Sequence, residues 1–157
     1  MPETDTPGPI AEAVELWTLG RKLTSLLERR LDRELRAGLG ISVQRYTLVG
    51  TLCGHEGDLN QQHVAELLGF TKSSVSRHVE AAERAGDVIV LPSPHSRREK
   101  ILRLTPSGRA LALRGDEVFA AVVADVAESA GAGGLEATVQ ALRSITEVLA
   151  AGQQTTT

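Results

Sequence analysis

Two cations and three hydroxyl groups lie within one six-residue stretch, Lys72-Ser-Ser-Val-Ser-Arg77. Lysine and arginine bind phosphate oxygens, and arginine and serine also donate hydrogen bonds to base edges in the major groove of DNA. At the start of a helix, such a stretch is suited to contact duplex DNA. The alternative is that these groups are ordinary solvated residues of a first helical turn, because short motifs often arise by chance. The candidate contact residues are Lys72, Ser73, Ser74, Ser76 and Arg77.

A second pair of cations, Arg97 and Arg98, lies between two segments that favour β-structure, Val88–Leu91 and Lys100–Leu104. The pattern predicts a β-hairpin whose loop carries both arginines. Guanidinium groups at a loop tip can enter a narrow minor groove, whose potential attracts them. The alternative leaves them in solvent or in a surface ion pair with Glu99. Because the hairpin directly follows the serine-rich helix, we interpret it as a DNA-binding wing.

The element that must present the serine-rich stretch is a helix-turn-helix. Ala65, Gly69 and Val75 have the spacing that this motif requires. The small alanine lets two helices approach closely, the glycine permits a left-handed turn, and the valine packs the second helix against the first. Asn60 and Thr71 are the expected N-caps of these two helices.

Longer helices are predicted on both sides of this motif. Apolar residues recur at helical spacing from Ile10 onward, Gly38 and Gly40 are expected to end that helix, and Ser42 is expected to cap the next. Thr105 and Pro106 supply an N-cap and a first helical residue, and four residues from Gly131 to Gly134 should break the helix that follows. The predicted helices are 10–37, 43–54, 61–68, 72–86, 106–129 and 135–150, and the predicted strands are 88–91 and 100–104.

The distribution of charge favours a local DNA-binding module. The whole chain of 157 residues carries a formal net charge of −3, which by itself argues against nucleic acid. Between Thr71 and Arg103, however, seven lysines and arginines outnumber four acids. The rest of the chain is therefore acidic, and the basic residues are concentrated where the contact residues are predicted.

No enzymatic site can be identified in the sequence. It contains no phosphate-binding glycine loop, no serine nucleophile elbow and no paired catalytic carboxylates. The histidines at 55, 63, 78 and 95 lack the paired spacing of a helical zinc motif, so no metal and no cofactor are expected. Cys53 could act as a redox sensor, but we interpret it as a small buried hydrophobe.

The sequence predicts a cytoplasmic protein that does not enter the membrane. No run approaches the roughly 20 apolar residues that span a bilayer, and the polar start Met1-Pro-Glu-Thr-Asp lacks the features of a signal peptide. A single cysteine agrees with a reducing compartment. Both ends, residues 1–9 and 152–157, are polar and are expected to be flexible.

The segment from Ser42 to Leu111 resembles the MarR family of winged helix-turn-helix transcriptional regulators. Family members usually have aspartate at the wing position occupied by Ser96, where it orients the arginine two residues on. Either Arg98 is therefore held differently here, or the DNA contact moves to Arg97. The matching residues are Val64-Ala-Glu-Leu-Leu-Gly-Phe70, Ser73-Ser-Val-Ser-Arg77, Gly86, Ser96-Arg-Arg98 and Leu104-Thr-Pro-Ser-Gly108.

The resemblance implies a mainly α fold with a small β-hairpin wing, flanked by N- and C-terminal dimerisation helices. The implied divisions are a dimerisation helix over 10–41, the winged helix-turn-helix over 42–111 and two dimerisation helices over 112–151. Such a homodimer places two recognition helices in successive major grooves of a pseudo-palindromic operator, about 34 Å apart. An intrachain helical bundle would satisfy the same apolar periodicity equally well.

The resemblance also implies a ligand-responsive repressor whose effector is a small anionic or phenolic molecule. Residues that could border its site are Trp17, Arg21, Arg45, Tyr46 and His55. Each of them could equally be a packing or surface residue. The competing functional interpretation is a helical protein-interaction or ligand-binding dimer that does not bind DNA.

Overall fold

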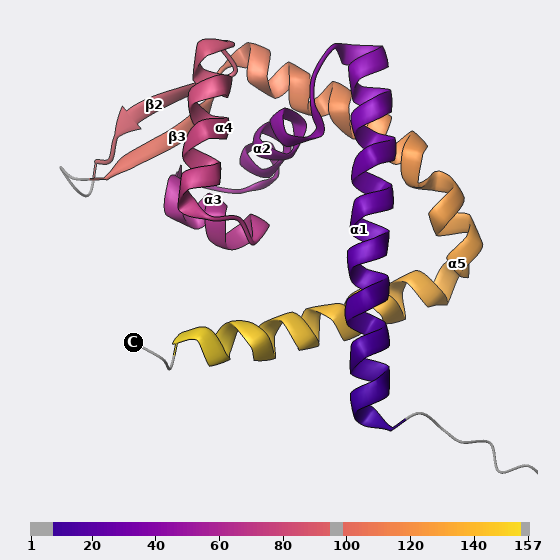
Figure 1. Cartoon of the computed structure of the whole chain (residues 1–157). Coiled ribbons are helices and arrows are strands. Elements are labelled where there is room, and N and C mark those ends of the chain that lie inside the picture. The colour runs from indigo at the N-terminus through magenta and orange to yellow at the C-terminus, as the bar shows by residue number, and fades with distance from the viewer. Residues whose placement is uncertain (1–7, 95–98, 155–157) are drawn as a thin grey trace, which may run out of the picture. The chain divides into compact units, whose positions relative to one another are not determined.

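The computed structural model of the protein describes residues 8–94 and 99–154, and it is mainly helical with one small sheet (Figure 1). The chain divides into two compact units, residues 1–119 and 120–157. The high helical content and the single small sheet confirm the predicted fold class of a mainly α protein with a β-hairpin. In chain order the elements are α1 (Pro9–Leu39), α2 (Val43–Gly54), β1 (Leu59–Asn60), α3 (Gln61–Leu68), α4 (Lys72–Arg84), β2 (Val88–Pro92), β3 (Lys100–Leu104) and α5 (Pro106–Gln154).

The sheet has three antiparallel strands in the order β1-β3-β2. The predicted hairpin is confirmed: β2 pairs with β3 from Val88 opposite Leu104 to Pro92 opposite Lys100. Strand β1 was not predicted, because two residues are too few to show an alternating pattern. It pairs with β3 through Leu59 opposite Leu102, and so joins the start of α3 to the hairpin.

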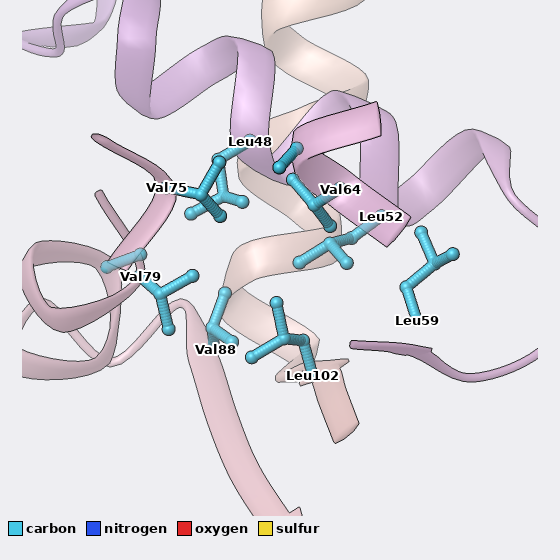
Figure 2. Close-up of a cluster of buried hydrophobic side chains, with 10 residues drawn as sticks. Leu48, Leu52, Leu59, Val64, Val75, Val79, Val88 and Leu102 are labelled. Atoms are coloured by element: carbon cyan, nitrogen blue, oxygen red, sulfur yellow. The ribbon is translucent and has the colours of Figure 1, made fainter. Parts of the chain in front are cut away.

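A cluster of buried apolar side chains packs between α2, α3, α4 and the sheet (Figure 2). Val64 is fully buried, and Val75 and Val79 are each 1% exposed. Burying each such side chain contributes roughly 1.5–3 kcal/mol to stability. The inner face of α4 is therefore firmly attached to the rest of the unit. The members of the cluster are Leu48, Leu52, Leu59, Val64, Ala65, Val75, Val79, Ala82, Val88 and Leu102.

Helix α1 extends two residues past its predicted end at residue 37. It passes through Gly38 and ends where Gly40 adopts the left-handed conformation, with a φ of 68°. The predicted stop is therefore confirmed at Gly40, whereas Gly38 stays helical, because a glycine inside a helix costs only about 1 kcal/mol and need not stop it. After the turn, the carboxylate of Asp32 accepts a hydrogen bond from the backbone N–H of Val43, at 2.9 Å. This contact ties α1 to the N-terminus of α2.

Helix α5 is interrupted at Gly131, whose φ of 69° and ψ of 166° are not helical. The expected break between two helices is therefore confirmed at Gly131. It is narrower than predicted, because Gly133 and Gly134 remain helical, and the first arm extends past its expected end near Ser129. The second arm extends to Gln154, past the expected end at 150. The remaining residues of the predicted flexible ends, 1–7 and 155–157, lie outside the described part of the chain.

Among the described helices, none is by itself long and apolar enough to cross a membrane. Only the two arms of α5 taken together, as a bent pair, would meet those criteria by length and composition.

Candidate nucleic-acid interface

Helices α3 and α4 form the predicted helix-turn-helix. Ala65 is buried where the helices meet, and its carbonyl accepts a hydrogen bond from the backbone N–H of Phe70, at 2.9 Å. Between them, Gly69 has a φ of 64°, the left-handed conformation that favours glycine. Val75 is buried on the inner face of α4. The roles that the sequence predicted for Ala65, Gly69 and Val75 are thus confirmed.

Helix α4 carries the two predicted cations, Lys72 in its first turn and Arg77 on the side away from the core. The side chains of Lys72 and Arg77 are exposed, and neither forms an ion pair with a described residue. Val75, Val79 and Ala82 form the opposite, buried face. Because the buried face fixes the rotation of the helix, both cations are held toward solvent and are free to bind an anion.

The three serines of α4 are less free than the cations. Ser73 is exposed, whereas Ser74 and Ser76 are half-buried. Each hydroxyl already has a partner within one helical turn, and these contacts would have to be shared or exchanged on binding a base. The contacts are Ser73 with Thr71 at 3.2 Å, Ser74 with His78 at 3.3 Å, and Ser76 with Glu80 at 3.4 Å.

The N-terminus of α4 adds a positive potential to this face. Thr71 caps the helix as predicted, and its hydroxyl accepts a hydrogen bond from the backbone N–H of Ser74, at 3.2 Å. The remaining N–H groups of the first turn point away from the helix body, and the helix dipole favours an anion there. Together with Lys72, this end of the helix is suited to a phosphate group.

A hollow of about 400 Å³ lies beside the start of α4, between the helix-turn-helix and the end of the hairpin strands nearest the loop. Lys72 and Lys100 line it, together with the polar side chains of the first turn of α3. Gln61, Gln62 and Lys100 were not predicted to belong to a site. Gln61 and Gln62 directly follow the predicted N-cap Asn60, and this position is the sequence signal that could have indicated them. The lining residues are Asn60, Gln61, Gln62, Lys72, Glu99 and Lys100.

The strands of the hairpin are described, but its tip is not. Ser96, Arg97 and Arg98 lie outside the described residues, so the predicted minor-groove contact stays a prediction. On β3, Arg103 forms an ion pair with Asp58, with Nη2 and Oδ1 3.0 Å apart. This cation therefore holds the strand to the segment before β1.

Behind the interface, Arg45 of α2 forms two hydrogen bonds with Asp87, which lies between α4 and β2. The distances are 2.6 Å from Nε to Oδ2 and 2.9 Å from Nη2 to Oδ1. Asp87 is 3% exposed and is the only buried polar or charged residue in the described part of the chain. The hydrogen bonds to this carboxylate raise the pKa of Arg45.

The backbone beside Asp87 is also held from α5. The hydroxyl of Thr105 donates to the carbonyl of Gly86, at 2.7 Å, and the hydroxyl of Ser107 donates to the same oxygen, at 3.0 Å. The backbone N–H of Thr105 donates to the carbonyl of Asp87, at 2.9 Å. Thr105 also caps α5, as predicted, by accepting from the N–H of Gly108.

The five candidate effector residues are not gathered into one site. Trp17 is 65% exposed on α1, and the guanidinium of Arg21 lies 5.5 Å from the centre of its ring. Arg45 is occupied by its ion pair with Asp87. His55 lines a separate hollow of about 400 Å³ together with Asp58, Leu59, His63, Glu66 and Leu67.

The fifth candidate, Tyr46, joins α2 to the first part of α5. Its hydroxyl donates to the carboxylate of Asp116, at 2.8 Å, and its ring centre lies 6.3 Å from that of Phe119. Partial burial, followed by the hydrogen bond to Asp116, raises the pKa of Tyr46. The phenol therefore stays protonated, and in this structure it serves as a packing residue.

Cys53 is half-buried, and Nη1 of Arg109 lies 3.9 Å from its Sγ atom. The expectation of a fully buried side chain is therefore wrong, because the end of α2 is only partly covered. Within the described residues, no group of three or more histidine, cysteine, aspartate or glutamate side chains could hold a metal ion.

Comparison with known proteins supports the predicted resemblance. The model of the MarR family matches residues 39–99, which contain α2, the helix-turn-helix and strand β2. The transcriptional regulator BldR from Sulfolobus solfataricus has a similar structure, with a TM-score of 0.80 and 20% identity over 90% of this chain and 99% of BldR. The predicted resemblance is thus confirmed over residues 39–99, and the chain has the fold of these regulators.

Two further structures of this fold contain bound molecules. A mutant of MarR from E. coli complexed with operator DNA has a TM-score of 0.73 and 16% identity, over 88% of this chain and 99% of that one. CouR from Rhodococcus jostii RHA1, bound to p-coumaroyl-CoA, has a TM-score of 0.73 and 23% identity, over 81% and 88% of the two chains. No curated protein sequence matches the chain significantly.

Proposed function

We propose that this protein is a sequence-specific DNA-binding repressor, which acts in the cytoplasm as a homodimer on a pseudo-palindromic operator. The observation that carries the proposal is a pair of exposed cations on α4, Lys72 in its first turn and Arg77 on the side away from the core. Neither has a carboxylate partner among the described residues, and the helix that carries them is fixed by its buried face. The binding of operator DNA by the similar MarR of E. coli supports this assignment.

Exposed apolar side chains on α1 support the proposed homodimer. A single chain leaves a row of large apolar groups in water along the first half of this helix. An exposed patch of this kind usually marks an interaction surface. A second copy of the chain would bury it and would place two recognition helices about 34 Å apart. The exposed residues of α1 are Ile10, Val14, Leu16, Trp17, Leu19, Leu23 and Leu26.

The second arm of α5, considered by itself, supports the same assignment. Val139, Leu142, Ile145 and Leu149 lie at helical spacing, and each is between 38% and 66% exposed. They form an apolar stripe along this arm. We propose that this stripe contributes to the homodimer.

We also propose that a small anionic or phenolic effector weakens DNA binding. The support is indirect: the similar CouR binds p-coumaroyl-CoA, a ligand that combines a phenolic acyl group with phosphates. Trp17, Arg21, Arg45, Tyr46 and His55 remain the candidate residues. A change in DNA affinity on adding simple phenolic acids would support the proposal, and an unchanged affinity across such compounds would count against it.

The function is tested by selecting a preferred duplex from a random library and measuring the affinity of the full chain for it. We expect Arg77→Ala to weaken binding by about 1–3 kcal/mol in each half-site if the arginine reads a base. If it binds a phosphate, the substitution removes one contact from each protomer, and we expect the slope of affinity against salt to fall by about two in the homodimer. The matched control is Arg33→Ala, which removes an exposed arginine of α1 whose nearest partner is its neighbour Glu34.

Equal affinity of wild type, Arg77→Ala and Arg33→Ala would reject α4 as the recognition helix. No binding of the wild type to any selected duplex would reject the DNA-binding function. The competing interpretation, a helical interaction dimer, would then be favoured.

A further inference from the structure

The segment Gly86–Asp87 connects the end of the recognition helix to the first strand of the wing, and two other elements hold it. We call this segment, together with the side chains that hydrogen-bond to it, the wing-root clamp. Arg45 binds it from α2, and Thr105 and Ser107 bind it from the start of α5. We infer that Arg45 and Asp87 are positioning residues that set the orientation of α4 and the wing for DNA, an inference that rests on the proposed function.

The ion pair of the clamp is geometrically specific. Two nearly parallel hydrogen bonds, of 2.6 and 2.9 Å, join the guanidinium fork of Arg45 to both carboxylate oxygens of Asp87. A bidentate pair fixes the relative direction of the two groups as well as their distance. Because the pair connects α2 to Asp87, in the short turn that follows α4, it restricts rotation of the recognition helix relative to α2.

Stability alone does not explain a charge at this position. The Asp87 side chain is 4% exposed, and removing a carboxylate from water costs several kcal/mol, which the ion pair must offset. An apolar pair of similar volume often gives equal or greater stability at such a site. An apolar pair, however, has no preferred direction. The ion pair between buried Asp87 and half-buried Arg45 therefore contributes a defined geometry where the recognition helix and the wing meet.

The backbone of the clamp is held as specifically as its side chains. Gly86 has a φ of 78°, and its carbonyl accepts hydrogen bonds from the hydroxyls of both Thr105 and Ser107. At Gly108 the chain comes so close to the carbonyl of Asp87 that a Cβ atom would overlap it. The end of α4 is thus confined on the α5 side, and Arg45 supplies the restraint on the α2 side.

The test compares DNA affinity, which should depend on the geometry of the ion pair, with the melting temperature, which should not. In the double variant Arg45→Met/Asp87→Leu, apolar groups replace the ion pair, so we expect a melting temperature within a few degrees of the wild type. We expect its affinity for the selected duplex, measured well below that temperature, to fall at least tenfold. Wild-type affinity in a stably folded double variant would overturn the inference, because a merely structural pair would be fully replaced.

If the double variant does not fold, a more conservative substitution tests the same inference. Arg45→Lys keeps the positive charge beside Asp87 but loses the fork, so we expect a folded protein with at least threefold weaker DNA binding. The effect should also depend on Arg77. If the clamp acts through the orientation of α4, the losses from Arg45→Lys and Arg77→Ala will not be additive in a double-mutant cycle. Additive losses, or unchanged affinity of Arg45→Lys, would overturn the inference.

The outcome for the proposed function is read in the same assay. In one outcome the wild type and Arg33→Ala bind the duplex, Arg77→Ala binds it weakly, and the clamp variants bind like the wild type. This result would overturn only the positioning role of the clamp and would leave the proposed function intact. If the wild type does not bind duplex DNA, both the function and the positioning role are overturned.

Discussion

Replacing Gly108 by alanine should destabilise the protein, although alanine is the better helix former. Gly108 is buried in the first turn of α5, and a Cβ atom there would overlap the carbonyl oxygen of Asp87. The overlapping group is backbone, held by a hydrogen bond from the backbone N–H of Thr105, and cannot turn away. Inserting a methyl group into such a contact costs about 1–3 kcal/mol, and the gain in helix propensity offsets at most about 1 kcal/mol.

We therefore expect Gly108→Ala to lose about 1–2 kcal/mol, which lowers the melting temperature by roughly 2–8 °C in a chain of this size. Thermal unfolding followed by circular dichroism at one fixed protein concentration measures the difference, since a dimer's melting temperature depends on concentration. The matched control is Gly38→Ala in α1, where no atom lies within 4 Å of the added Cβ. That variant should gain about 0.5–1 kcal/mol. A Gly108→Ala variant as stable as the wild type would refute the close contact with Asp87.

Three further predictions concern the supports of the site, and all are measured by thermal unfolding. Val75→Ala should lower the free energy of unfolding by about 2 kcal/mol, since it leaves a cavity at the buried face of α4. A loss below about 0.5 kcal/mol would contradict the packing of this helix. Thr71→Ala should cost about 1 kcal/mol through loss of the N-cap, whereas Thr71→Ser should be nearly neutral. Hydrogen bonds from Arg36, and then from the N–H of Val43, lower the pKa of Asp32. The Asp32 carboxylate therefore contributes to the free energy of unfolding above its ordinary pKa of 3.8, and this contribution is lost as the pH falls through the lowered value. Asp32→Ala should therefore lower the melting temperature at pH 7 but not at strongly acid pH, and a constant difference across this range would contradict the role of the charge.

The elements of the DNA-binding region could be predicted because their boundaries are set by local chemistry. Asn60 and Thr71 cap α3 and α4 through contacts with residues three positions on, and Gly69 makes the turn between them. At the end of α1, the sequence offered two glycines and did not distinguish them. Only Gly40 takes the left-handed conformation, and that choice depends on how α2 packs after the turn.

The parts that could not be predicted depend on contacts between distant residues. Arg45 and Asp87 are 42 positions apart, and neither belongs to a motif that requires the other. From the sequence, Arg45 was therefore predicted to be a candidate effector residue and not the partner of Asp87. Likewise, the hollow lined by Lys72 and Lys100 is formed by three separate segments, which only the sheet pairing of β1 with β3 brings together.

The salt dependence of binding to random duplex DNA tests the central claim most directly. If Lys72 and Arg77 of each protomer bind phosphates, a homodimer makes about four such contacts. The affinity should then fall roughly a hundredfold between about 50 and 200 mM salt. The contradictory result is the absence of duplex affinity even at the lowest salt concentration, because an exposed cationic face on a recognition helix must attract the phosphate backbone there.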